Sequence, residues 1–194
     1  MSTFLRHRLW PAIALLTAFT VITGLVYPLL VTVVAQVAFP TQANGSFVVT
    51  ADGRTIGSSL IGQAFDQPKY FWGRPSAAGK DGYDASGSAG SNLGPTSQAL
   101  IDRVTADIDR LRAANGGGRV PVDLVTTSAS GLDPEISPAA AEYQVARVAA
   151  ARAMAPDDVR AAIARHTQQP LLGFVGEPRV NVLLLNLDLD GLLK

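Results

Sequence analysis

The sequence contains no cysteine and only two histidines, His7 and His166, among its 194 residues. The absence of cysteine excludes disulfide bonds and thiolate ligands. A transition-metal site or a Ser-His-Asp triad would depend on His166 alone, and no G-x-S-x-G sequence is present to hold a nucleophile. We therefore expect no catalytic residues and no metal ligands, and we interpret His166 as a solvated residue near the end of a helix.

Phosphate-binding and phosphorylation motifs are also missing, because neither G-x-x-x-x-G-K-[ST] nor D-K-T-G occurs. The 16 basic residues balance the 16 acidic ones, and without Arg6 and Arg8 the remainder has a net charge of −2. This balance leaves no basic surface for nucleic acid. The acidic residues in "DLDG", beginning at Asp188, are interpreted as solvated carboxylates at the end of a strand.

A long uncharged run is present instead, since residues 9–51 include no Lys, Arg, Asp, Glu or His. At about 1.5 Å per residue, the apolar part of residues 11–39 is longer than the roughly 30 Å hydrocarbon core of a bilayer. The run predicts one membrane-spanning helix, with Gly24 and Pro28 tolerated inside it. Membrane lipid is therefore an expected partner.

The flanking charges predict the orientation of this helix. Arg6 and Arg8 precede it, whereas the first basic residue after it is Arg54, and cytoplasmic flanks carry the excess of Lys and Arg. The amino terminus should be cytoplasmic and the remainder should lie on the outer side of the membrane. A cleaved signal peptide, with Val33 and Ala35 before the cut, is the alternative, although its apolar region would be unusually long.

The remaining sequence predicts an α+β fold, with helices packed on a small sheet. We divide the chain into residues 1–40, the cytoplasmic end and the span, and residues 41–194, a single outer domain. Strands are expected at 47–50, 56–63, 122–126 and 179–189, with a hairpin turn at Asp52-Gly53. Helices are expected from Ser97 to the "NGGG" sequence, from Ser137 as N-cap, and from Pro156 to about His166.

A long polar loop covers residues 66–96, and ordered loops of this length tend to be functional. Its start, Tyr70, Phe71 and Trp72 beside Arg74, has the composition of an interaction surface. The same aromatic residues could equally fold onto the core of the domain. Asn92, Ser130 and Asp133 lie in turn-rich segments and are further candidates for contacts with a partner, or for fixing the turns themselves.

Several motifs together resemble the C subunit of the Kdp potassium-transporting P-type ATPase, over the whole chain and in the same order. They are "GSSLIGQAF" at 57–65, "YFWGRPSA" at 70–77, "GSNLGP" at 90–95, "PVDLVTTSASGLDPEIS" from 121 and "GEPRVNVLLLNLDLD" from 176. The resemblance implies an accessory, non-catalytic subunit in the cell inner membrane. Its implied partners are a potassium-selective channel-like subunit, an ATP-hydrolysing P-type subunit and a small single-span subunit.

The resemblance also implies a chaperone role in which Gln63 contacts nucleotide and raises the affinity of the pump subunit for ATP. The flanking charges place Gln63 across the membrane from cytoplasmic ATP, so we expect ATP to act only through the complex and no cofactor to be bound covalently. A periplasmic cap over the potassium entrance is the function that the predicted topology favours. A membrane-tethered binding or sensor module is the alternative.

Overall fold

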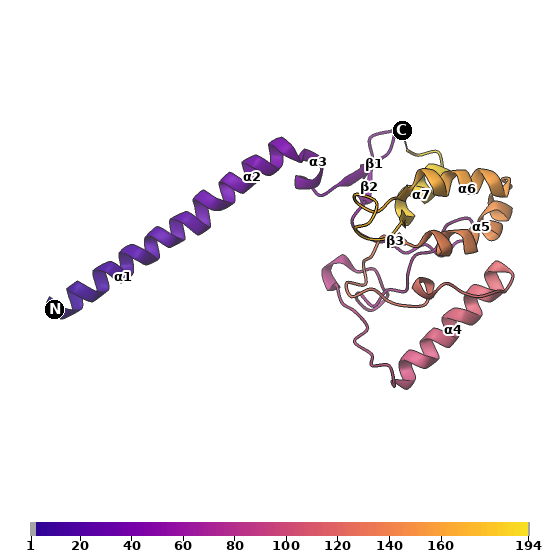
Figure 1. Cartoon of the computed structure of the whole chain (residues 1–194), viewed down its shortest axis with the longest axis horizontal. Coiled ribbons are helices and arrows are strands. Elements are labelled where there is room, and N and C mark those ends of the chain that lie inside the picture. The colour runs from indigo at the N-terminus through magenta and orange to yellow at the C-terminus, as the bar shows by residue number, and fades with distance from the viewer. Residues whose placement is uncertain (1–2, 194) are drawn as a thin grey trace. The chain divides into compact units, whose positions relative to one another are not determined.

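The computed structural model describes residues 3–193, with side chains from His7 onward, and its contacts separate one unit ending at Ser46 from another beginning at Phe47 (Figure 1). Arg6, on which part of the predicted orientation rests, lies outside the residues whose side chains are described.

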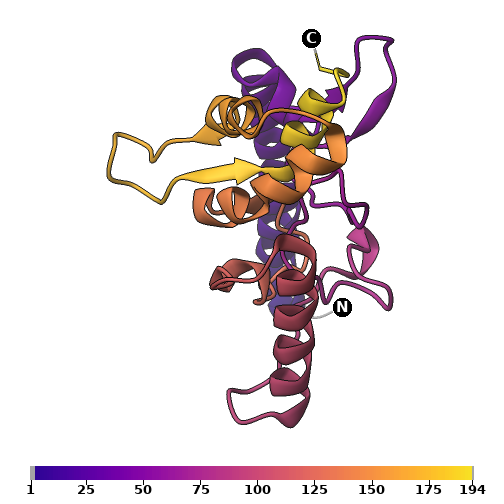
Figure 2. The same cartoon turned by 90° about the vertical axis from the view of Figure 1, so that its right-hand side faces the viewer.

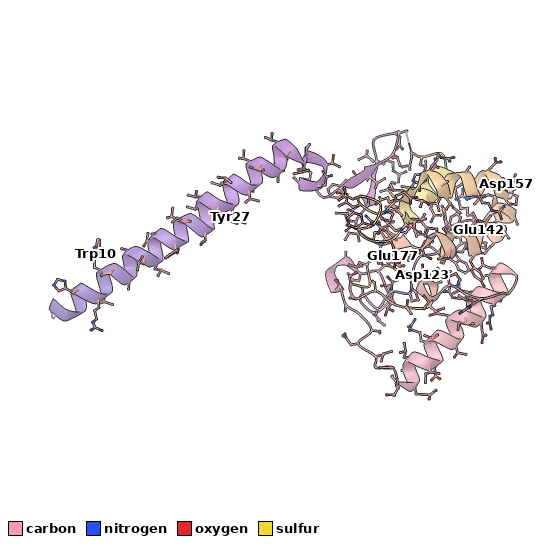
Figure 3. The ribbon with its side chains drawn as sticks, viewed as in Figure 1. Trp10, Tyr27, Asp123, Glu142, Asp157 and Glu177 are labelled. Atoms are coloured by element: carbon pink, nitrogen blue, oxygen red, sulfur yellow. The ribbon has the colours of Figure 1, made fainter. Side chains whose placement is uncertain are left out.

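The first unit is the predicted apolar helix. It runs through α1 (Thr3–Val21), η1 (Ile22–Val26) and α2 (Tyr27–Ala38), and the short helix α3 (Pro40–Ala43) follows it. Residues His7–Ala38 are long and apolar enough to cross a membrane, at 32 residues or about 48 Å. Its large apolar side chains are exposed along the whole length, as Figure 3 shows for Trp10 and Tyr27.

The segment η1 is a turn of π-helix that ends two residues before Pro28. Proline has no N–H to donate, and its ring would collide with the carbonyl group four residues earlier in a regular α-helix. The wider turn avoids this conflict, since the N–H of Tyr27 donates to the carbonyl of Ile22, five residues back. The proline therefore remains inside a continuous helix.

The second unit begins with the predicted hairpin. Strand β1 (Phe47–Val49) pairs antiparallel with β2 (Thr55–Ser58). The turn holds Gly53 at a φ of 86°, which confirms the assignment of a turn to Asp52-Gly53. The second strand ends at Ser58, five residues earlier than predicted, because the chain turns away through Leu60 and Ile61.

The three predicted helices are confirmed. Helix α4 (Gln98–Asn115) follows Ser97 and ends at Gly116, which has a φ of 78°. Helix α5 (Pro138–Arg152) begins at the N-cap Ser137, whose hydroxyl accepts a hydrogen bond from the N–H of Ala140. Helix α6 (Pro156–Arg165) ends against His166.

Two predicted strands are wrong. Residues 122–126 contain the 3-10 helix η3 (Val122–Leu124), because Pro121 has no N–H for a strand ladder and its carbonyl instead accepts from Leu124. A second 3-10 turn, η2 (Ala85–Gly87), interrupts the predicted long loop.

The strand expected at residues 179–189 is mostly a helix. Only β5 (Arg179–Asn181) is extended, and it lies between β3 (Glu135–Ile136) and β4 (Thr167–Gln168) in an antiparallel sheet. The side chain of Asn181 then accepts from the N–H of Leu184 at 3.0 Å and starts helix α7 (Val182–Leu189). A leucine-rich run that is buried all round has no periodicity by which to distinguish a helix from a strand.

The core of the second unit lies where α4, α5, α6, α7 and the three-stranded sheet meet the aromatic segment at residues 70–72 (Figure 2). A smaller cluster joins Val48 of β1 to Leu183 and Leu187 of α7. The predicted α+β class is confirmed, with two small sheets in place of one.

Candidate functional site

Three segments that lie far apart in the sequence form one connected structure, which we call the loop platform: Gly62, residues 74–92 and residues 126–133. The N–H of Gly62 donates to the carbonyl of Leu132 at 2.8 Å, and the N–H of Ala89 donates to the carbonyl of Ser130 at 3.0 Å. Backbone bonds between loops leave little freedom to either partner. Arg74, Ser130 and Asp133 were all predicted as contact residues, and the platform brings the segments that contain them together.

Arg74 is the central side chain of the platform. Its Nη1 lies 2.7 Å from the Oδ2 atom of Asp133, and the pair is about one quarter exposed. Its other nitrogens donate to the carbonyl oxygens of Thr126 and Thr127, at 3.2 and 3.3 Å. Because the guanidinium is planar and binds three separate acceptors, it holds residues 126–133 at a fixed position relative to Arg74.

Tyr83 completes the platform from the other end of the loop. Its hydroxyl donates to the carbonyl of Arg74 at 2.5 Å, while the hydroxyl of Ser76 donates to the carbonyl of Gly131 at 2.6 Å. Burial raises the pKa of Tyr83 to about 12, and the charge of Asp133 contributes in the same direction. The phenol is therefore neutral at physiological pH and acts as a hydrogen-bond donor.

Two glycines of the platform lie where no side chain fits. A Cβ atom on Gly62 would stand 2.7 Å from the carbonyl oxygen of Asp133 and 2.8 Å from the ring of Tyr83. Gly131 has a φ of 65°, and a Cβ atom there would stand 2.6 Å from the carbonyl oxygen of Ala89. Both glycines belong to the motifs that mark the sequence, so these motifs record close packing between loops.

The aromatic segment next to the platform folds onto the core. Phe71 is fully buried and Trp72 is 8% exposed. Two buried amide side chains form hydrogen bonds with the backbone of Phe71 and Trp72, in the way that a neighbouring strand would. Asn186 bonds the N–H and the C=O of Phe71, at 2.8 and 3.0 Å, and Gln144 bonds the same groups of Trp72, at 2.8 and 3.1 Å.

Asn186 and Gln144 hold the aromatic segment in place, and neither residue was predicted from the sequence. The available signal was a polar amide inside a leucine-rich or alanine-rich helix. Such a group must find hydrogen-bond partners when it is buried. The identity of those partners, 115 and 72 positions away, is not visible in the sequence.

Arg147 packs against the ring of Trp72. Its guanidinium lies 4.0 Å from the centre of the Trp72 ring, and Arg110 lies 5.0 Å from it. Arg147 donates to the side chains of Asn115 and Gln144 and to the carbonyl groups of Pro68 and Tyr70. Burial, and secondarily the charge of Arg110, lowers the pKa of Arg147 to about 10, so the residue stays charged at neutral pH.

Tyr70 is partly exposed and ends the segment on the other side. Its hydroxyl donates to the Oδ2 atom of Asp190 at 3.0 Å, and Arg152 binds the Oδ1 atom of the same carboxylate at 2.8 Å. Tyr70 thus ties the aromatic segment to the end of α7.

The remaining candidates have separate positions. The Nε2 atom of Gln63 donates to the carbonyl of Ile56 at 3.3 Å, so the amide is turned onto its own hairpin. The carbonyl of Ser130 accepts from the hydroxyl of Ser88 at 3.0 Å. Asn92 is exposed at the edge of the platform, with a φ of 52°.

His166 follows the end of α6, as predicted, but its side chain is 18% exposed and that of Asp188 is 26% exposed, so the interpretation of both as solvated residues is wrong. Asp188 lies in α7, not at a strand end, and its Oδ2 atom is 2.7 Å from Arg165 and 3.0 Å from the Nε2 atom of His166. Burial raises the pKa of Asp188, but these two hydrogen bonds and charges outweigh burial and lower it. The three residues connect α6 to α7, which their positions in the sequence did not reveal.

An open depression of about 270 Å³ lies beside the platform, where Arg74, Asp133 and Glu135 meet Asp123 and Glu177. Figure 3 labels Asp123 and Glu177 at this place. Arg74 and Arg179, which also line it, are already bound by Asp133 and Glu135. Among residues 3–193 no group of three His, Cys, Asp or Glu side chains is placed to hold a metal ion.

Comparison with known proteins accounts for the coincidence of these motifs. The family described as "KdpC: K+-transporting ATPase, c chain" matches residues 9–191. The chain belongs to the KdpC family. A potassium-transporting ATPase KdpC subunit of Sorangium cellulosum is 60% identical over 186 residues, covering 95% of this chain and 97% of the relative.

Two further KdpC subunits extend the comparison. The protein of Herpetosiphon aurantiacus is 59% identical over 192 residues and covers 98% of this chain and 97% of itself. The protein of Dechloromonas aromatica is 54% identical over 196 residues and covers all of both chains. The KdpC identity assigns the chain to potassium transport, as an accessory subunit of the membrane-bound Kdp ATPase complex.

Proposed function

We propose that the second unit is a non-catalytic periplasmic domain that holds the Kdp complex together and caps its potassium entrance. The observation that carries this proposal is the loop platform, whose polar groups bond one another. The loops are held by hydrogen bonds from the side chains of four residues: Arg74, Asp133, Ser76 and Tyr83. A surface built in this way presents a fixed shape, which suits docking to another protein.

The proposed partners are the potassium-selective channel-like subunit, the ATP-hydrolysing P-type subunit and the small single-span subunit of the complex. Among the residues predicted as contacts from the sequence, those with exposed atoms are the candidates for binding these subunits, above all Asn92, Ser130 and the edge of Tyr70. Phe71 and Trp72 support this surface from the core.

We further propose that the chain influences ATP affinity only through the complex. Gln63 supports this proposal because its amide bonds to Ile56, and a Cβ atom on the neighbouring Gly57 would meet that amide at 2.1 Å. The side chain is therefore confined by its own hairpin. The full-length chain alone in detergent should not bind a fluorescent ATP analogue, and saturable binding would contradict this part of the proposal.

The orientation can be tested with single cysteines, since the natural sequence has none. Ala113→Cys lies on the exposed side of α4, and Thr3→Cys precedes the span. In intact spheroplasts, an impermeant thiol reagent should label the first variant and should reach the second only after lysis. The reverse pattern would place the domain in the cytoplasm and would reopen direct contact with ATP.

A deletion tests the assembly role. Without this chain, the other Kdp subunits should no longer co-purify as a complex, and potassium-stimulated ATPase activity should be lost. Restoration by the full chain, but not by the span alone, is the result expected if the domain supplies the contacts.

A further inference from the structure

A hairpin between β4 and β5 carries a cluster of exposed apolar side chains, and Figure 2 shows this orange-yellow hairpin projecting from the body of the domain. Leu171 and Val175 pair across it. Leu172 is 78% exposed and Phe174 is 77% exposed. We call residues 171–175 the apolar tip. Large apolar side chains gathered at such an outlying position gain nothing from the core of their own domain.

The turn inside the apolar tip is strained. Leu172 has a φ of 55° and Gly173 a φ of 81°, and the N–H of Phe174 donates to the carbonyl of Leu171 at 3.3 Å. Tight turns with two positive φ values favour Asn, Asp or Gly at the first of these positions. A leucine there is strained, and its exposed side chain provides no packing in return. No contact of Leu172 within residues 47–193 explains why leucine stands at this position.

The charges beside the tip restrict the partner. The depression at the base of the hairpin has four acidic residues and two arginines: Asp123, Asp133, Glu135, Glu177, Arg74 and Arg179. Both arginines are already paired, and Glu177 has no ion pair among the described residues. The surface next to the apolar tip is therefore negative.

This charge argues against a lipid surface and against a second copy of the chain. Segments that bind membrane surfaces carry Lys and Arg beside their apolar residues, because lipid headgroups are often anionic. A symmetric contact between two tips would bring the two acidic surfaces together. A protein with an apolar cleft and a basic rim complements both properties.

We propose that the apolar tip docks into an apolar cleft of another subunit of the Kdp complex, and that a Lys or Arg on the rim of the cleft pairs with Glu177. This inference rests on the proposed function in taking the partner from the same complex. It goes beyond that function in naming the contact surface and the chemistry of its counterpart.

Substitutions in the tip separate docking from folding. Leu172→Asn suits the positive φ, so the unfolding midpoint of the full chain in detergent should stay the same or rise. The double variant Leu172→Asn/Phe174→Ser should be retained in the purified complex at least fivefold less than the wild-type chain. Ile101→Ser is the matched control, because Ile101 is 49% exposed and lies neither in the tip nor in the lining of the depression. Equal retention of the double variant and the control would overturn the inference.

Glu177→Lys tests the charge. Retention should fall at low ionic strength and recover toward the wild-type value at about 1 M salt, where surface charges are screened. Retention that is unchanged at every salt concentration would remove the rim residue from the proposal.

A photoreactive benzoyl-phenylalanine at position 174 identifies the occupant directly in the assembled complex in its native membrane. We expect a covalent product with another Kdp subunit, identified by mass spectrometry. A product with lipid, a product with a second copy of this chain, or no product would overturn the inference. If the tip variants assemble normally while deletion of the chain still dissolves the complex, only this inference fails; if deletion leaves the complex intact, the proposed function fails too.

Discussion

Asn186 binds both the N–H and the C=O of Phe71, although 115 positions separate the two residues. The amide of one helical side chain thereby replaces the neighbouring strand that Phe71 lacks. Gln144 does the same for Trp72, so an irregular segment passes through the core with its backbone groups satisfied.

Replacement of this amide should be costly. Asn186→Leu keeps the number and branching of the side-chain heavy atoms but leaves two buried backbone groups of Phe71 unpaired, at about 1–3 kcal/mol each. We expect the free energy of unfolding to fall by about 2–5 kcal/mol in urea titrations of the full chain in detergent. Gln168→Leu, on the exposed end of β4, is the control and should change it by less than about 0.5 kcal/mol.

A methyl group on Gly62 tests the close packing of the loop platform. Gly62→Ala should lower stability by about 1–3 kcal/mol, because Asp133 and Tyr83 would have to move. Gly94→Ala has no atom within 4 Å of its new Cβ and should be tolerated. Equal thermal midpoints for the two variants would show that the platform is looser than its contacts indicate.

Tyr83 predicts a loss of stability at high pH. Its pKa is about 12 in the folded chain against an ordinary value of 10.0, so the unfolded chain loses the proton first. The contribution is present below pH 10 and is lost as the pH rises through 12, by about 3 kcal/mol. Tyr83→Phe should show a correspondingly shallower decline between these pH values in denaturant titrations.

Asp188 predicts the opposite dependence at low pH. The pKa of its carboxyl group is lowered from 3.8 in the folded chain, so its contribution is present above that value and disappears as the pH falls through the folded pKa. Asp188→Asn should reduce stability by about 1 kcal/mol at pH 7. The difference between variant and wild type should shrink as the pH falls below 3.8 and through the folded pKa; a difference that does not shrink there would assign it to packing.

The sequence was sufficient for the elements that have a clear local signal. The uncharged run predicted the apolar helix, Ser137 predicted the start of α5, and "NGGG" predicted the end of α4. The motifs were sufficient for the family. Residues 182–189 were misassigned because a mostly buried leucine run shows no periodicity, and the helix depends on the cap provided by Asn181.

The candidate site was predictable only in part. Arg74 and Asp133 were both selected from the sequence, but their ion pair joins positions 59 residues apart. The apolar tip was not selected, because it lies in a turn-rich segment between the helix predicted to end near His166 and the strand predicted from residue 179. The tip is exposed because β4 and β5 pair only at residues 167–168 and 179–180, and the chain between them leaves the sheet. This short pairing could not be predicted from the sequence.

The short connection after the span affects how strongly the apolar tip must bind. Only eight residues, 39–46, join the last residue of the span to the first strand. Once the span has inserted beside other Kdp subunits, docking of the domain becomes an intramolecular event, and short linkers give effective concentrations of about millimolar. A contact with a dissociation constant near 100 μM would then be occupied most of the time, so a small apolar tip is large enough to hold the domain in place.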